Sequence, residues 1–164
     1  MTIDSLLTNV QTLKSELENG LLIRGVLVGH KGHIMEEQRI QLLGGKSSSG
    51  EDLHPYYTED PYFHTTASAK RYADWKKDMV YPYVVPRFWN APNLYINGKF
   101  HHELDVTFAP DYCVVNGTTP YSVNIVAKYG LGNFGLSDSS WKTIFDEKGA
   151  KEEVITKTKE IIYG

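Results

Sequence analysis

The sequence predicts an α+β fold in which helices at both ends pack on a small antiparallel sheet, with long extended loops, or arms, between them. Apolar residues recur at helical spacing near both ends of the chain, strand-like alternation appears around residues 104–115, and proline- and glycine-containing stretches separate these segments. At 164 residues the chain is expected to form a single domain. Its expected parts are a helical N-terminal part (1–44), an extended arm (45–66), and a helix, hairpin and C-terminal helices (67–164).

The first 43 residues predict two helices. An apolar stripe before the stop signal Asn19-Gly20 predicts a short amphipathic helix; the stripe consists of Ile3, Leu6, Leu7, Val10, Leu13 and Leu17. Apolar residues recur again over 21–43 and predict a second, longer helix. Because glycine destabilises a helix interior, Gly25, Gly29 and Gly32 predict a bend or break there.

Two long segments are predicted to lack regular structure. Residues 44–50 are rich in glycine and serine, and Pro55 and Pro61 favour an extended course over 53–63. A second ordered loop is expected over 81–93, where three prolines lie among aromatic residues. Both segments are expected to run over the surface.

The segment between these loops predicts a helix over about 67–79, capped by Thr65 or Thr66. Its inward stripe is expected to contain Tyr72, Trp75 and Met79. Four basic residues are expected on a solvated face, since the net charge of −3 disfavours a nucleic-acid patch: Lys70, Arg71, Lys76 and Lys77.

An antiparallel hairpin is predicted from residues 104–108, a turn at Pro110-Asp111, and a return strand over 112–115. Residues 121–129 fit either a strand or a helix, and the helix is favoured. The single cysteine, Cys113, is expected to be a buried or half-buried free thiol. Tight turns are expected at Asn97-Gly98 and Asn116-Gly117.

Gly130, Gly132 and Gly135 match the G-x-G-x-x-G pattern of dinucleotide-binding loops. That loop requires a second strand after its helix, whereas the sequence after Gly135 predicts helix to its end, the last element spanning about 150–162. The pattern therefore predicts a turn that starts a helix at Ser137, without a cofactor. Three residues of that helix are expected to face inward: Trp141, Ile144 and Phe145.

No pattern of catalytic residues stands out, so no catalytic or metal-binding residue and no cofactor is predicted. Nucleophile and phosphate-loop motifs are missing from the sequence. The densest group of potential metal ligands, His101-His102-Glu103, lies in sequence read as strand, where adjacent side chains point to opposite faces. A metal-assisted hydrolase that uses these residues remains an alternative. More distant histidines are His30, His33, His54 and His64.

Aromatic residues make up 12% of the chain, and many lie in the two predicted loops. Aromatic side chains are enriched in protein interfaces, which favours contacts with other molecules; filling of the core is the open alternative. The expected interface residues are Tyr56, Tyr57, Tyr62, Phe63, Tyr81, Tyr83, Phe88 and Trp89.

Four segments in order resemble the tailed-bacteriophage minor tail or tail-completion proteins, which act at the neck between head and tail. They are the loop Gly45-Lys46-Ser47-Ser48-Ser49-Gly50 with its following tyrosines, the helix 70–77, the turn segment 93–101, and the region from Lys128 to Phe134-Gly135-Leu136-Ser137. Asn97 stands where the family pattern has threonine before glycine.

The resemblance implies a structural virion protein and no enzyme. Copies are expected to form a sixfold or twelvefold ring that contacts portal or adaptor proteins and tail-tube proteins, with DNA passing through the lumen. Assembly is expected in the cytoplasm of the bacterial host, without a membrane partner. A ligand-binding module, whose aromatic loops include Trp89 and whose helix includes Trp75, is the other alternative.

Overall fold

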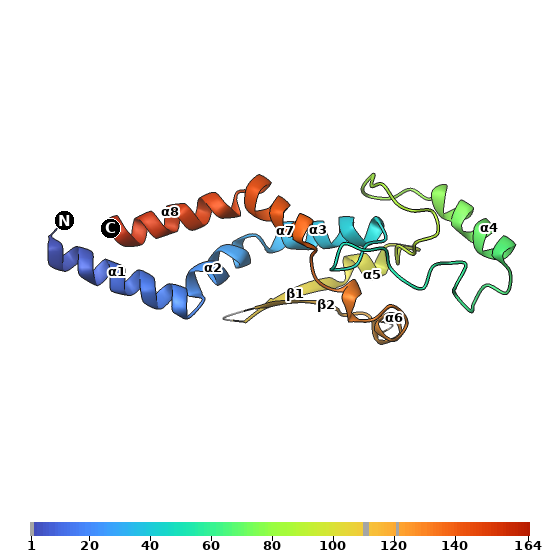
Figure 1. Cartoon of the computed structure of the whole chain (residues 1–164), viewed down its shortest axis with the longest axis horizontal. Helices are drawn as coiled ribbons and strands as arrows, with labels where there is room; N and C mark the ends of the chain where they lie inside the picture. Colours follow the sequence, from blue (N-terminus) through green and yellow to red (C-terminus); the bar gives the residue numbers. More distant parts are fainter. Residues whose placement is uncertain (1, 110–111, 121) are drawn as a thin grey trace.

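The computed structural model describes residues 2–109, 112–120 and 122–164 and confirms the α+β class. The molecule is elongated, with both chain termini at one slender end (Figure 1). This end, the helical stem, consists of α1 (Ile3–Glu18), α2 (Leu21–Gly29) and α8 (Ala150–Tyr163). We call the remainder the body.

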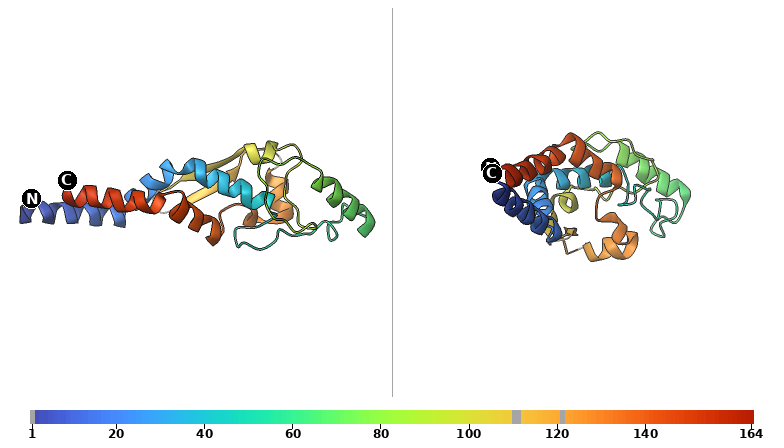
Figure 2. Two further views of the ribbon diagram at one scale, coloured as in Figure 1. Left: turned by 90° about the horizontal axis from the view of Figure 1, so that it is seen from above. Right: turned by 60° about the vertical axis from the view of Figure 1, so that its left-hand side comes forward.

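In the stem, the first and last helices of the chain, α1 and α8, run antiparallel and pack along each other. Thr2 caps α1 by accepting a hydrogen bond from the Ser5 amide, and Gly20 turns the chain into α2 with φ 66°. The Asn9 side-chain amide donates to the Ile162 carbonyl oxygen at 2.9 Å. The views in Figures 1 and 2 agree that α8 runs alongside α1.

The break predicted within residues 21–43 is confirmed. Helix α2 ends at Gly29, and α3 (Lys31–Leu43) begins after His30. The His30 ring lies 3.1 Å from Glu153 of α8 (Nε2 to Oε2) and 3.1 Å from His33 (Nδ1 to Nδ1). The junction between stem and body is therefore held by side chains from α3, from α8 and from the residue that links α2 to α3.

The predicted hairpin is confirmed as β1 (Leu104–Phe108) and β2 (Cys113–Gly117), paired antiparallel with Val106 opposite Val115. The second strand is longer than expected and includes Asn116-Gly117, which was predicted as a turn. The predicted turn at Pro110-Asp111 lies outside the described residues. Helix α3 packs on β1, whereas α1 packs on α2 and α8.

The main core lies in the body, between α3, the hairpin and the segment that follows the glycine turn at residues 130–135. Its buried side chains include Ile34, Leu42, Phe100, Val106 and Ile144. Cys113 is a half-buried free thiol at its edge, as predicted, and burial raises the pKa of this thiol.

Two short helices lie on either side of the hairpin in the sequence, and only the second was predicted. Residues Lys99–His102 form α5, so the strand expected around the histidines is wrong; Gly98 starts this turn with φ 78°. The ambiguous segment forms α6 (Ser122–Tyr129), which confirms the favoured helix; Tyr121, which the prediction included, lies outside the described residues.

Helix α4 (Thr66–Lys77) has Thr65 as its N-cap, as predicted. Its predicted inward stripe is confirmed only for Tyr72, which packs beside the buried Ala69 and Ala73. Trp75 is half exposed, Met79 lies beyond the end of the helix, and α4 buries Lys76 instead. Lys76 therefore corrects the expectation of a solvated basic face. The small residues let the neighbouring loop approach the helix, and the long lysine side chain fills the space beyond them.

The two long loops are extended, but they bind each other. Residues 44–65 and 78–98 meet where the Tyr57 amide donates to the Asn90 carbonyl oxygen at 3.0 Å and the Asn90 side chain exchanges hydrogen bonds with Thr58. The predicted extended arm (45–66) is therefore hydrogen-bonded to another loop of its own subunit. None of the described helices combines the length and apolar character that crossing a bilayer requires.

The glycine turn that follows α6 contains the short helix Leu131–Asn133 and is clamped by two buried glutamines of α3. Gln38 donates to the Asn133 carbonyl and accepts from the Gly135 amide; Gln41 donates to the Gly135 carbonyl and accepts from the Ser137 amide. The distances lie between 2.8 and 3.2 Å. These protein contacts occupy the backbone groups that a bound phosphate would need.

Ser137 caps α7 (Asp138–Lys142), as predicted, and a π-helical turn (Thr143–Glu147) follows. Ile144 is fully buried, and Trp141 and Phe145 pack against the core. The last element, predicted over about 150–162, is confirmed as α8; the helical sequence is interrupted at Lys148 and Gly149, where Gly149 has φ 86° and is the N-cap of α8.

Candidate assembly interface

The clearest unpartnered feature of the structure is the apolar surface of the stem. Every residue of α1 is described, and none is buried. Its apolar residues Ile3, Leu6, Val10, Leu13 and Leu17 follow the alternating three- and four-residue spacing of helices that pack along one another. Helix α1 therefore carries a packing stripe that its own subunit leaves largely in contact with solvent.

Helix α8 covers only one side of that stripe. Ile3 is 86% exposed, Leu7 57% and Leu17 51%. On α8 itself, Ile155 is 44% exposed. The neighbours of α1 within its own subunit, α2 and α8, leave these side chains exposed, and an exposed apolar surface of this kind is typical of a protein-binding site.

A groove of about 810 Å³ continues this surface at the base of the stem. It lies between the α1–α2 turn, the end of the hairpin and α7, and its apolar lining includes Leu17, Ile23, Leu27, Phe108 and Trp141. Leu17 belongs to both the stripe and the groove. A partner helix that packs on the stem would therefore meet a recess at its end.

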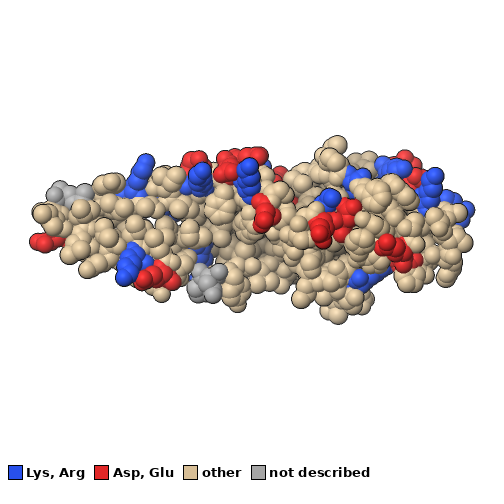
Figure 3. All heavy atoms as spheres, in the orientation of Figure 1, with Lys and Arg blue, Asp and Glu red and all other residues tan. Residues whose placement is uncertain are grey.

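Charges on the stem are arranged around the apolar surface. The face of the stem seen in Figure 3 is largely uncharged, with charged side chains along its upper and lower edges. Lys14 pairs with Glu18 on α1, and Lys157 with Glu153 on α8. Opposite charges compensate one another within each pair, while Asp4 and Glu16 leave α1 with a net negative charge.

The predicted aromatic interface residues are distributed differently. Tyr57 is only 5% exposed and forms a small second core with Ala69 and Ala73, so the structure assigns it to packing within the subunit. Phe63 and Trp89 are half-buried against that core. The other predicted residues divide into the half-buried Tyr56, Tyr81 and Tyr83 and the exposed Tyr62 and Phe88.

The histidines named for a metal-assisted hydrolase do not converge. The His101 ring is buried, its Nε2 atom donates to the Asn93 carbonyl oxygen at 3.0 Å, and desolvation lowers its pKa to about 4. His54 instead pairs with Glu59 at 3.1 Å in the loop. Among the described residues, no three His, Cys, Asp or Glu side chains are close enough to share an ion.

A separate cavity of about 420 Å³ lies in the body between α4, α5, α6 and residues 92–98. Sequence analysis missed it because Lys76, one of its lining residues, follows a helical charge pattern that normally indicates a solvated face. The stem stripe could have been recognised from its heptad-like spacing, which the prediction used only to assign a helix.

The chain was also compared with models of protein families, with curated proteins and with solved structures, and none of the three comparisons gave a match.

Proposed function

We propose that this protein is a structural, non-enzymatic subunit that assembles with copies of itself through the helical stem. The observation that carries the proposal is the open apolar stripe of α1, which has no buried residue among Ile3–Glu18. Burial of such side chains in a partner interface is favourable by about 25 cal/mol per Å² of apolar surface. Assembly supplies the layer of packing that the stem lacks.

The assembled form is a ring at the head–tail neck or tail end of a tailed bacteriophage. The resemblance of four segments, in the same order along the chain, to tail-completion proteins supports this location. An elongated subunit with an exposed apolar surface at one end suits a ring in which subunits are arranged radially. A closed ring needs two unlike contact surfaces on each subunit. The α1 stripe and the groove lined by Phe108 and Trp141 provide two such surfaces.

In this proposal the ring has sixfold or twelvefold symmetry, joins portal or adaptor proteins to tail-tube proteins, and lets DNA pass without gripping it. The net charge of −3 supports the last point, because a strongly basic lining would bind phosphate. The subunit is made in the host cytoplasm and incorporated into the virion.

The test is the oligomeric state of a stem variant. The triple change Ile3→Ser, Val10→Ser and Leu17→Ser removes exposed apolar side chains from α1 without touching a buried residue. We expect the wild type to form oligomers as its concentration rises in sedimentation experiments, and the variant to remain monomeric. Electron micrographs of the wild-type oligomer should show closed rings.

The control changes two apolar residues of the body that are more exposed than the three stem residues. Val80 and Val84 are 90% and 103% exposed in the loop after α4, so Val80→Ser with Val84→Ser should leave assembly intact. A wild type that stays monomeric at every concentration, or a stem variant that assembles normally, contradicts stem-mediated assembly. A compact dimer in the micrographs contradicts the ring alone.

A further inference from the structure

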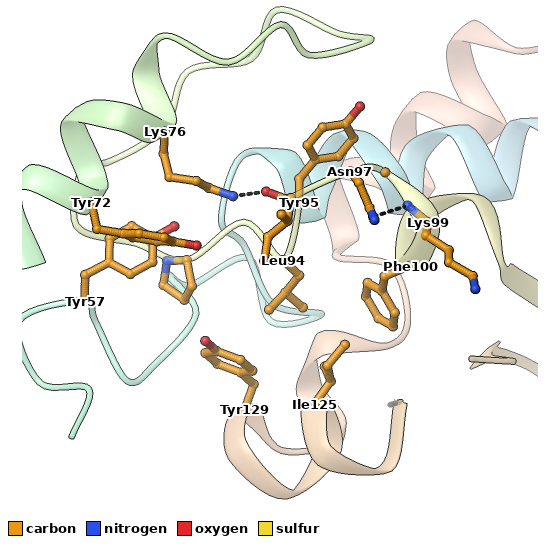
Figure 4. A pocket seen from close by; sticks show the side chains of 13 residues that line it. Tyr57, Tyr72, Lys76, Leu94, Tyr95, Asn97, Lys99, Phe100, Ile125 and Tyr129 are labelled. Carbon is orange, nitrogen blue, oxygen red and sulfur yellow. Dashed lines mark hydrogen bonds between the residues drawn. The ribbon is translucent and has the colours of Figure 1, made fainter. Parts of the chain in front are cut away.

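The cavity of the body has the dimensions of a small-molecule site. Its volume of about 420 Å³ falls within the ~300–1,000 Å³ range typical of ligand pockets. Its walls come from α4, from the continuous segment of residues 92–98 and α5, and from α6, three regions that are distant from one another in sequence (Figure 4). It lies in the body and is lined by none of the stem residues, so its role is independent of the proposed assembly.

The lining combines apolar surface with aromatic rings. Leu94, Phe100 and Ile125 form an apolar floor, and the rings of Tyr72 and Tyr129 stand beside it (Figure 4). Desolvation raises the pKa of both tyrosines, so they stay neutral. Such walls suit a flat apolar body, and their hydroxyl groups suit a polar substituent.

Lys76 is the one feature of this cavity that neither packing nor assembly accounts for. Its side chain is 1% exposed, and its Nζ atom donates a hydrogen bond to the Tyr95 carbonyl oxygen. An ammonium group has three N–H donors, so one backbone acceptor leaves it poorly satisfied. No carboxylate among the described residues pairs with it.

The surroundings of Lys76 make this deficit costly. Its charged neighbour Arg87 disfavours a further positive charge, and His101, which its low pKa keeps neutral at pH 7, supplies no compensating negative charge. The Tyr72 ring, whose centroid lies 6.0 Å from Nζ, gives only weak compensation. Desolvation lowers the pKa of Lys76 to about 7. A buried cation without an anion is expensive unless something else supplies the missing charge.

We propose that the cavity binds a small molecule that has one carboxylate and an apolar, ring-containing body. The carboxylate accepts hydrogen bonds from Lys76 Nζ, and the body lies between the tyrosine rings and the apolar floor. A single buried lysine matches a monoanion; a phosphate dianion would require further donors. Lys99, the other lysine of the lining, is half exposed and directed to Glu103 at 3.9 Å.

The decisive experiment compares two probes that differ only in charge. 4-Phenylbutyrate and its neutral amide, 4-phenylbutyramide, share one apolar body, and their binding to the full chain is measured by calorimetry and by saturation-transfer NMR. We expect the acid to bind wild-type protein about tenfold more tightly than the amide, because the acid alone forms a charge-assisted hydrogen bond with Lys76. Equal binding of the two probes, or no saturable binding of either at millimolar concentration, overturns the proposal.

Variants then identify the group that recognises the charge. Lys76→Met keeps a linear, slightly shorter side chain and removes the amine, so it should abolish the preference for the acid and lower the affinity for the acid more than that for the amide. Lys70→Met, at an exposed position of the same helix outside the cavity, is the matched control and should retain the preference. Persistence of the preference in Lys76→Met contradicts the assigned role. The wild-type comparison of the two probes decides the proposal even if that variant misfolds.

Discussion

The helical stem and the body use their apolar side chains in opposite ways. In the body, α3 presents Ile34 and Leu42 to a hairpin and to the segment around Ile144, and all three side chains are fully buried. In the stem, α1 has a regular apolar stripe at three- and four-residue spacing and buries none of it. The less regular helix is thus the buried one, and the more regular stripe is the exposed one.

This difference shows that an apolar stripe specifies a need for burial and leaves its partner undefined. Helix α3 meets side chains from distant parts of its own chain, whereas α1 meets only its stem neighbours α2 and α8, which leave its stripe exposed. The polar groups follow the same division: the body contains the buried Gln38, Gln41 and Lys76, while the ion pairs of the stem lie at its surface. We therefore expect substitutions to affect folding in the body and association in the stem.

The largest effect should come from paired isoleucine truncations. Ile144 is fully buried and Ile155 is 44% exposed, so Ile144→Ala should lower the free energy of unfolding by about 2–5 kcal/mol and Ile155→Ala by much less. Urea denaturation at low protein concentration measures both. At high concentration Ile155→Ala should weaken association instead. Similar losses of stability for the two variants at low concentration would remove the distinction between stem and body.

A second effect depends on pH and concerns the buried charge of the body. The pKa of Lys76 is lowered from 10.5 to about 7 in the folded protein, so the unfolded state binds more protons between these values. Relative to Lys76→Met, wild-type stability should rise by about 1.4 kcal/mol per pH unit above pH 7 and level off near the unfolded pKa.

Below pH 7 the lysine is charged in both states, and Lys76→Met should be the more stable protein. Urea denaturation of both proteins at several pH values gives this difference. The exposed Lys70→Met variant should show no such slope. A pH-independent difference between wild type and Lys76→Met would mean that Lys76 keeps an ordinary pKa.

The smallest effect concerns two matching helix caps. Thr2 in the stem and Thr65 in the body each accept a hydrogen bond from the amide three residues later, at 3.2 and 3.1 Å. Thr65→Ala should cost about 1 kcal/mol of global stability. Thr2→Ala should instead speed hydrogen exchange at the start of α1, with little change in global unfolding, because that end frays independently. Equal global costs would show that α1 unfolds together with the body.

Local signals predicted much of this fold. Thr65 and Ser137 mark helix starts, the glycines near His30 mark the break between α2 and α3, and alternation identifies the hairpin. These features depend on residues close in sequence, where capping, helix propensity and side-chain period act directly. The short helix α5 was not predicted because four residues are too few to show a helical period.

The candidate sites depended on contacts between distant segments and were predicted less well. Tyr57 lies in loop sequence, yet Asn90 and α4 enclose it, so its burial has no local signal. Lys76 shares the spacing of its exposed neighbours and is buried only because residues 92–98 and α6 close over it. The stem stripe was visible in the sequence, but the missing partner layer was visible only in three dimensions.

The glutamine clamp on the glycine turn makes the protein sensitive to a chemical change of a single group. Gln38 and Gln41 each act as donor and acceptor at once, so hydrolysis of either amide to a carboxylate would replace a donor with an oxygen facing a carbonyl oxygen. The resulting glutamate would also place a negative charge in the interior. Deamidation at either position would thus release the link between α3 and the closing helices, although the side chain would hardly change in shape.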